Sequence, residues 1–205
     1  HEGFGEKYAM KQLTSDREAW RIEARFLREF AAHVNRYTGF RYADDPSTIA
    51  FECINEPGYP DGHPDAAVTE YIDTLVGAIR STGTKKPVYY NGCHGAKARN
   101  AALNASIADG ATGSCYPTGT MNGRALYGSQ LGHLSHSTFL LDPSVPITKP
   151  KMVYEFDAAD TPGAYLYPAF AKMFRAEGVE LAHVFDYDPV DIADENMSTP
   201  THYLN

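Results

Sequence analysis

Apolar positions along the chain switch between two spacings, one typical of helices and one typical of buried strands. Between about Ser15 and Val34, apolar residues recur every three or four positions, which predicts an amphipathic helix. Ser15 and Glu18 fit a capping box, so we expect this helix to begin at Ser15. The following run Ile49–Glu56 is short, mostly apolar and stopped by Pro57, which predicts a buried strand.

The same alternation continues through the rest of the chain. Further helices are expected over about 65–80, 96–105 and 162–178, and further strands over 87–91, 111–116, 151–157 and 181–187. Alternating strands and helices indicate a parallel α/β sheet. Residues 117 to about 150 are long for a connection, and such a segment usually builds a binding wall or a lid.

Five strands are too few to close an eight-stranded barrel, which typically needs about 250 residues. The 205 residues therefore predict an open sheet or the C-terminal part of a (β/α)8 TIM barrel that is incomplete in this chain. In either case we expect one α/β domain over residues 1–205.

Composition narrows the possible partners. The formal net charge of -8 argues against nucleic acid or an anionic membrane surface, and no run approaches the roughly 18 apolar residues of a membrane helix. Carboxylates together with 14 Tyr and 10 Phe suit a neutral sugar. Cys53, Cys93 and Cys115 form no metal-binding spacing and are expected to be buried free thiols. We expect neither a metal site nor a cofactor.

Two glutamates stand at the ends of predicted strands. Glu56 lies between Asn55 and Pro57, and Glu155 ends another apolar run 99 positions later. The C-terminal ends of parallel strands face the active site in α/β folds. Two carboxylates there can flank one glycosidic bond, one protonating the leaving oxygen and one attacking the anomeric carbon. A separation of about 5–5.5 Å gives retention, and about 6.5–9.5 Å gives inversion.

Two passages resemble the clan A glycoside hydrolases, most closely family five, the cellulase and β-mannanase type. They are YTGFRYADDP at 37–46 and FECINEP at 51–57, and the likeness extends over strands four to eight of that family's barrel. The resemblance implies that Glu56 is the acid/base and that Asn55 binds the sugar 2-hydroxyl. Glu155, in VYEF at 153–156, occupies the place of the family's nucleophile on strand seven.

The resemblance also suggests substrate contacts and shows departures. Tyr116 is carried over as the hydroxyl that contacts the nucleophile, while Ser114 stands where the family has the His of His-x-Tyr. The family's Trp after strand eight is replaced by Phe185-Asp-Tyr187. Three more predicted substrate-binding residues lie at or near the ends of strands: Asn91, His94 and Tyr187.

Two polar residues on predicted strands, Glu52 and Asn91, have structural interpretations that need no substrate. Glu52 shares the strand parity of Glu56, so its side chain points to the same face, and we expect a buried carboxylate paired with an arginine. Asn91 ends a strand, where an asparagine often forms a turn instead of a binding site.

These patterns predict a retaining glycoside hydrolase that cleaves a β-linked glycoside or polysaccharide by double displacement. Glu155 would attack the anomeric carbon, and Glu56 would protonate the leaving oxygen and then deprotonate water. Nearby negative charge on Glu155 would help Glu56 to keep its proton at the start.

Two alternatives remain at this point. The first is a catalytically inactive carbohydrate-binding protein on the same scaffold, and the second is an open-sheet protein whose Asn-Glu-Pro is coincidental. The expected partners are an oligo- or polysaccharide, and a missing N-terminal segment or a second copy that covers the open sheet edges. The expected location is secreted or periplasmic.

Overall fold

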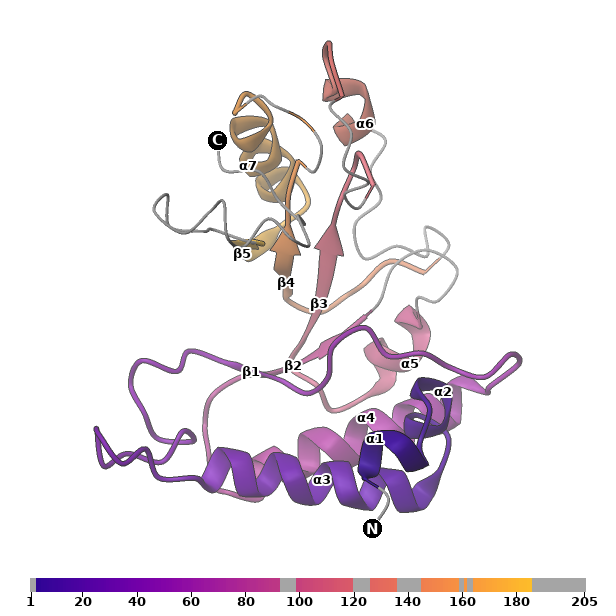
Figure 1. The fold of residues 1–205 in the computed structure, drawn as a ribbon, viewed down its shortest axis with the longest axis vertical. Coiled ribbons are helices and arrows are strands. Elements are labelled where there is room, and N and C mark those ends of the chain that lie inside the picture. Colours follow the sequence, from indigo (N-terminus) through magenta and orange to yellow (C-terminus); the bar gives the residue numbers. More distant parts are fainter. Residues whose placement is uncertain are drawn as a thin grey trace. The chain divides into compact units, whose positions relative to one another are not determined.

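The computed structural model describes residues 3–92, 99–119, 126–135, 145–158, 161 and 164–185. Its strands form one sheet in the order β1-β2-β3-β4-β5, so each strand neighbours the next one along the chain (Figure 1). Parallel pairing joins β1 to β2, β2 to β3 and β4 to β5, which confirms the predicted α/β class. The strands are Phe51–Glu52, Val88–Asn91, Gly110–Cys115, Lys151–Phe156 and Val179–Val184.

Helices separate the strands, as the apolar spacing predicts. The helix expected over 65–80 is confirmed to the residue as α4, and the long connection after β3 contains a short helix, α6. Two short N-terminal helices, α1 and α2, have no counterpart in the predicted pattern. From α1 to α7 the helices are Phe4–Lys7, Met10–Leu13, Arg17–Ala32, Asp65–Arg80, Asn100–Ala105, Leu131–Ser135 and Leu166–Ala176.

The chain divides into two compact units, and the boundary falls inside β3. The first unit runs to Thr112 and also takes in residues 145–149, so it holds β1, β2 and the first half of β3. The second unit begins at Gly113 and holds the rest of β3 together with α6, β4, α7 and β5.

The core of the first unit forms where α4 packs against β2 and α3. Tyr71 of α4 is fully buried, and its ring meets that of Tyr90 edge-on at 6.3 Å and that of Trp20 at 5.4 Å. The Tyr71 hydroxyl donates to Glu23 of α3 at 3.0 Å. Burial raises the pKa of the Glu23 carboxyl to about 7. Other α4 side chains complete this core: Val68, Ile72, Leu75, Val76 and Ile79.

The core of the second unit is an aromatic cluster between β4 and α7. The Phe156 ring lies 4.9 Å from Phe170 and 5.0 Å from Phe174, and all three side chains are buried. Leu166, fully buried in the first turn of α7, adds to the apolar face of that helix. Strand β4, which carries Glu155, is therefore backed by rigid and closely packed rings.

Several predicted boundaries are wrong. The helices expected over 96–105 and 162–178 are Asn100–Ala105 and Leu166–Ala176, and the strand expected over 181–187 is Val179–Val184. The start of the first predicted helix and the length of the first predicted strand are also wrong.

Helix α3 is capped by Asp16, whose carboxylate accepts from the amides of Glu18 at 2.8 Å and Ala19 at 3.4 Å. The Ser15 hydroxyl instead donates to the Lys11 carbonyl at 2.8 Å. A carboxylate caps a helix as well as a hydroxyl does, and its charge also interacts favourably with the helix dipole.

The strand expected over 49–56 keeps only two residues in the ladder, because the chain bends at Asn55 and Glu56. Cys53 and Cys115 are buried thiols outside any disulfide, as predicted, whereas Cys93 lies outside the described residues. Among the described helices, none is both long and apolar enough to cross a bilayer.

Candidate active site

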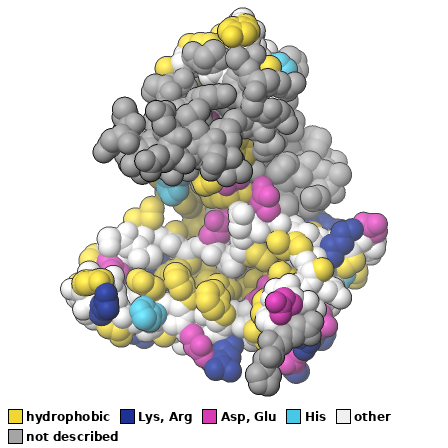
Figure 2. Space-filling view, viewed as in Figure 1, with side chains coloured by type: hydrophobic (Ala, Val, Ile, Leu, Met, Phe, Trp, Pro, Cys, Tyr) yellow, Lys and Arg dark blue, Asp and Glu magenta, His cyan; other side chains and the backbone are white. Residues whose placement is uncertain are grey.

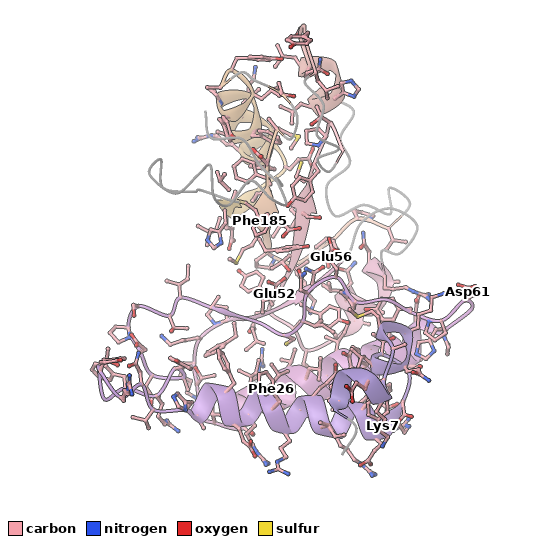
Figure 3. The ribbon with its side chains drawn as sticks, viewed as in Figure 1. Lys7, Phe26, Glu52, Glu56, Asp61 and Phe185 are labelled. Carbon is pink, nitrogen blue, oxygen red and sulfur yellow. The ribbon has the colours of Figure 1, made fainter. Side chains whose placement is uncertain are left out.

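In the first unit, Asn55 and Glu56 lie on a bend that two residues separate from the end of β1, and both are exposed. Figure 3 shows Glu56 in this segment. Glu56 has φ 43°, the only positive φ among the described residues other than glycine. This conformation is sterically costly for an L-residue, and a residue before proline is normally extended. Backbone strain of this kind persists where the surrounding structure imposes it, and it concentrates at functional sites.

The far end of this bend is fixed by three contacts. The hydroxyls of Tyr59 and Tyr90 are hydrogen-bonded at 2.7 Å in a buried position. The Thr14 hydroxyl donates to the Gly58 carbonyl at 2.6 Å. The Arg99 guanidinium lies 5.4 Å from the centre of the Tyr59 ring. The chain that follows Glu56 is thus held by a strand, the N-terminal helices and a cation–π contact.

At the near end of the bend, Glu52 is held by donors from two neighbouring strands. One oxygen, Oε1, accepts from Asn91 Nδ2 of β2 at 3.0 Å and from the Thr112 hydroxyl of β3. Asn91 and Thr112 are both almost completely buried. The predicted burial of Glu52 is wrong, since the residue is exposed and is held by two neutral donors. A role for Asn91 in sugar binding stays a prediction.

In the second unit, Glu155 of β4 is half-buried and accepts a hydrogen bond from the Tyr116 hydroxyl. Tyr116 directly follows β3. Burial, then the negative charge of Glu155 and the hydrogen bond to it, hold the pKa of the Tyr116 hydroxyl well above its usual range. Tyr116 is therefore a neutral donor at any physiological pH. The structure thus brings together the two residues that the family resemblance pairs.

Asp157 is a residue that the sequence analysis missed. It directly follows β4, is 3% exposed, and accepts from the Ala158 amide and the Tyr167 hydroxyl, both at 2.7 Å. Tyr167 belongs to α7, so the bond ties that helix to the strand end beside Glu155. The signal available in the sequence was an Asp directly after the apolar run that ends with Glu155 and Phe156.

Of the other residues named for the site from the sequence, His94, Tyr187 and Ser114, the structure describes only Ser114. His94 and Tyr187 lie outside the described residues. Ser114, at the position of the family's histidine, is 6% exposed in β3. Within the described part of the chain, no group of three or more His, Cys, Asp or Glu side chains is arranged to bind a metal ion.

An apolar cavity of about 290 Å³ opens in the first unit between α3 and β1. Phe26, Phe30 and Phe51 line it, with Glu52 and Asn55 among its polar wall residues. Figure 2 shows hydrophobic side chains gathered over α3 and in the hollow beside it. Phe26 and Phe30 are exposed, and β1 is the edge strand of the described sheet, so this face has the features of an interaction surface.

No model of a known protein family matches the chain, and no curated protein matches its sequence. Solved structures do match its fold. The endo-1,4-β-mannanase of Rhizomucor miehei is 16% identical with a TM-score of 0.59, covering 85% of this chain and 55% of that one. The endo-1,4-β-D-mannanase of Thermotoga petrophila RKU-1 is 16% identical with a TM-score of 0.62, covering 86% and 56%. A family 5 glycoside hydrolase mannosidase of Rhizomucor miehei is 15% identical with a TM-score of 0.56, covering 87% and 52%.

At these identities the likeness shows the fold. The chain has the fold of the clan A, family-five type of glycoside hydrolase and forms part of a TIM barrel, as predicted. It spans about half the length of the structures that it matches.

Proposed function

We propose that this chain carries the catalytic carboxylates of a retaining glycoside hydrolase acting on a β-linked polysaccharide. Glu155 is the nucleophile and Glu56 the acid/base. Three of the similar structures are β-mannan-cleaving or mannoside-cleaving enzymes, so β-1,4-mannan is the first substrate to test and cellulose the second. A polysaccharide substrate is too large to cross the cell membrane, so we expect a secreted or periplasmic location. Cell fractionation would check it.

The observation that carries the proposal is the hydrogen bond from Tyr116 to Glu155. A nucleophilic carboxylate must stay ionised and must face the anomeric carbon in one orientation. A neutral hydroxyl donor serves both needs, because a hydrogen bond to the charged form favours that form and fixes the direction of its lone pairs. The strained bend at Glu56 and the fold likeness add independent support.

The proposed reaction has two displacements. In the first, Glu155 forms a bond to the anomeric carbon while Glu56 gives its proton to the departing glycosidic oxygen. In the second, Glu56 removes a proton from water, whose oxygen bonds to the anomeric carbon and releases Glu155. Asn55, next to Glu56, donates to the sugar 2-hydroxyl.

The test combines product analysis with covalent trapping. The protein is incubated with β-1,4-mannan, new reducing ends are measured, and the first anomer is identified by proton NMR. A 2-deoxy-2-fluoro-β-mannoside with a good leaving group should accumulate as an ester on Glu155, located by peptide mass spectrometry, and Glu155→Gln should remain unlabelled.

Three results would contradict the proposal. A product of inverted configuration would assign a water-mediated single displacement. A label on another carboxylate would assign the nucleophile to that residue instead of Glu155. Binding of mannan without new reducing ends would favour the carbohydrate-binding alternative.

A further inference from the structure

Glu52 reaches along the sheet toward the end that carries Glu56. Its backbone partner on β2 is Tyr89, yet its carboxylate accepts from Asn91, two residues further on. Asn91 is in turn the register partner of Thr112, the second donor. The carboxylate of Glu52, the last ladder residue of β1, therefore joins three adjacent strands through side chains. We call Glu52, Asn91 and Thr112 the three-strand clamp.

The clamp and the Tyr59–Tyr90 pair hold opposite ends of the same segment. Successive residues of a strand point to opposite faces, so Tyr90 and Asn91 of β2 anchor the segment on two different faces of the sheet. Between these anchors lie residues 53–58, including the bend with Glu56 at φ 43°. The Cys53 amide, directly after β1, donates to the Tyr89 carbonyl of β2 at 3.2 Å.

We propose that Glu52 is a positioning residue: the three-strand clamp sets the place of the bend that carries Asn55 and Glu56. The inference rests on the proposed function for its catalytic consequence, while the geometry of the bend can be measured without any activity. The ladder of β1 is only two residues long, so the side-chain bonds of Glu52 to two neighbouring strands add restraint at the start of this segment. A shift of about 1 Å in a catalytic group costs up to about 10²-fold in rate.

The first readout is hydrogen exchange of the backbone amides in residues 53–59, measured in the full chain by peptide mass spectrometry. In Glu52→Ala these amides should exchange about tenfold faster, as expected for the loss of hydrogen bonds to a charged acceptor. Glu52→Gln keeps an acceptor oxygen of the same reach and should restore most of the protection. Tyr59→Phe should loosen the same segment from its other end.

Glu70→Ala is the matched control, because Glu70 also makes two side-chain bonds, to Arg17, but on the helical surface. It should leave exchange in residues 53–59 unchanged. Thr112→Val removes one donor to Glu52 at nearly constant volume, and it replaces Glu52→Ala if that variant fails to fold. It should also speed amide exchange in residues 53–59, by a smaller factor.

The second readout is steady-state hydrolysis of β-1,4-mannan. We expect kcat to fall about 10–10²-fold in Glu52→Ala with KM within about twofold, and to recover in Glu52→Gln. Unchanged exchange in both Glu52→Ala and Thr112→Val would overturn the clamp whatever the kinetics. Faster exchange in a protein whose wild type hydrolyses neither β-1,4-mannan nor cellulose would uphold the clamp and reject the proposed function.

Discussion

The two segments that carry the proposed catalytic carboxylates are built in opposite ways. Glu155 lies inside the six-residue strand β4, which is paired with β5 and backed by the Phe156, Phe170 and Phe174 cluster. Glu56 lies beyond a two-residue strand, on an exposed bend at positive φ. Glu155 lies at an irregularity of the β4–β5 ladder, between the paired residues Val153 and Phe156. One carboxylate is therefore carried by a packed strand, and the other by a strained turn with side-chain anchors on either side.

The difference matches the two chemical roles. A nucleophile must meet one carbon atom at a fixed distance, and a central strand position restricts it most. An acid/base exchanges protons with a leaving group and later with water, so it needs solvent access on a positioned loop. The structure of each segment is thus compatible with the role proposed for its glutamate.

The largest expected effect is the loss of activity on removal of either glutamate, and substrates with different leaving groups distinguish the role of one glutamate from that of the other. On mannan, both Glu56→Ala and Glu155→Ala should lose at least about 10³-fold in kcat/KM. On a dinitrophenyl β-mannobioside, whose leaving group needs no proton, the first bond-breaking step of Glu56→Ala should stay within about tenfold of wild type, since the general acid is not required. Pre-steady-state release of dinitrophenol measures this step.

Glu155→Ala should be inactive on both substrates, and Glu29→Ala on α3 should match the wild type on both. Equal losses by the two active-site variants on the activated substrate would remove the distinction between a nucleophile and an acid/base.

The sequence predicted the elements well and their side-chain contacts unevenly. Helix α4 was predicted to the residue because its apolar spacing is regular from Asp65 to Arg80. The pairing of Tyr116 with Glu155 came from the family resemblance, since residues on different strands show no mutual spacing. The bond from Thr112 to Glu52 joins positions 60 apart and depends on the register of three strands, which no local pattern reveals.

Boundaries failed where two neighbouring residues offer the same chemistry or where the chain leaves the ladder. Ser15 and Asp16 are both good caps, and tertiary structure selects Asp16. The strand that contains Glu52 was predicted too long because Cys53 and Ile54 continue the apolar run, although the ladder ends at Glu52 and the chain bends at Asn55 and Glu56.

A smaller effect is expected at Tyr116. Tyr116→Phe removes the donor to Glu155 and keeps the ring, and a hydrogen bond to a charged group contributes about 1.5–3 kcal/mol, so kcat should fall about 10–10²-fold. Steady-state kinetics on mannan measure the loss. Tyr127→Phe, at an 83% exposed position of the same unit, is the control and should keep wild-type kcat. A wild-type rate in Tyr116→Phe would show that β4 alone orients Glu155.

The smallest expected effect is on stability, and it tests the strained bend directly. Glu56→Gly should raise the free energy of unfolding by about 0.5–1 kcal/mol, because relief of about 1–2 kcal/mol at positive φ exceeds the entropy cost of about 0.5–1 kcal/mol for a glycine. Glu155→Gly in β4 and Asn55→Gly beside Glu56 carry the entropy cost without that relief, so both should lower the free energy of unfolding. Urea titrations followed by tyrosine and tryptophan fluorescence compare the three variants. A lower midpoint in Glu56→Gly as well would mean that the bend stores no strain, and backbone strain would then not distinguish the two segments.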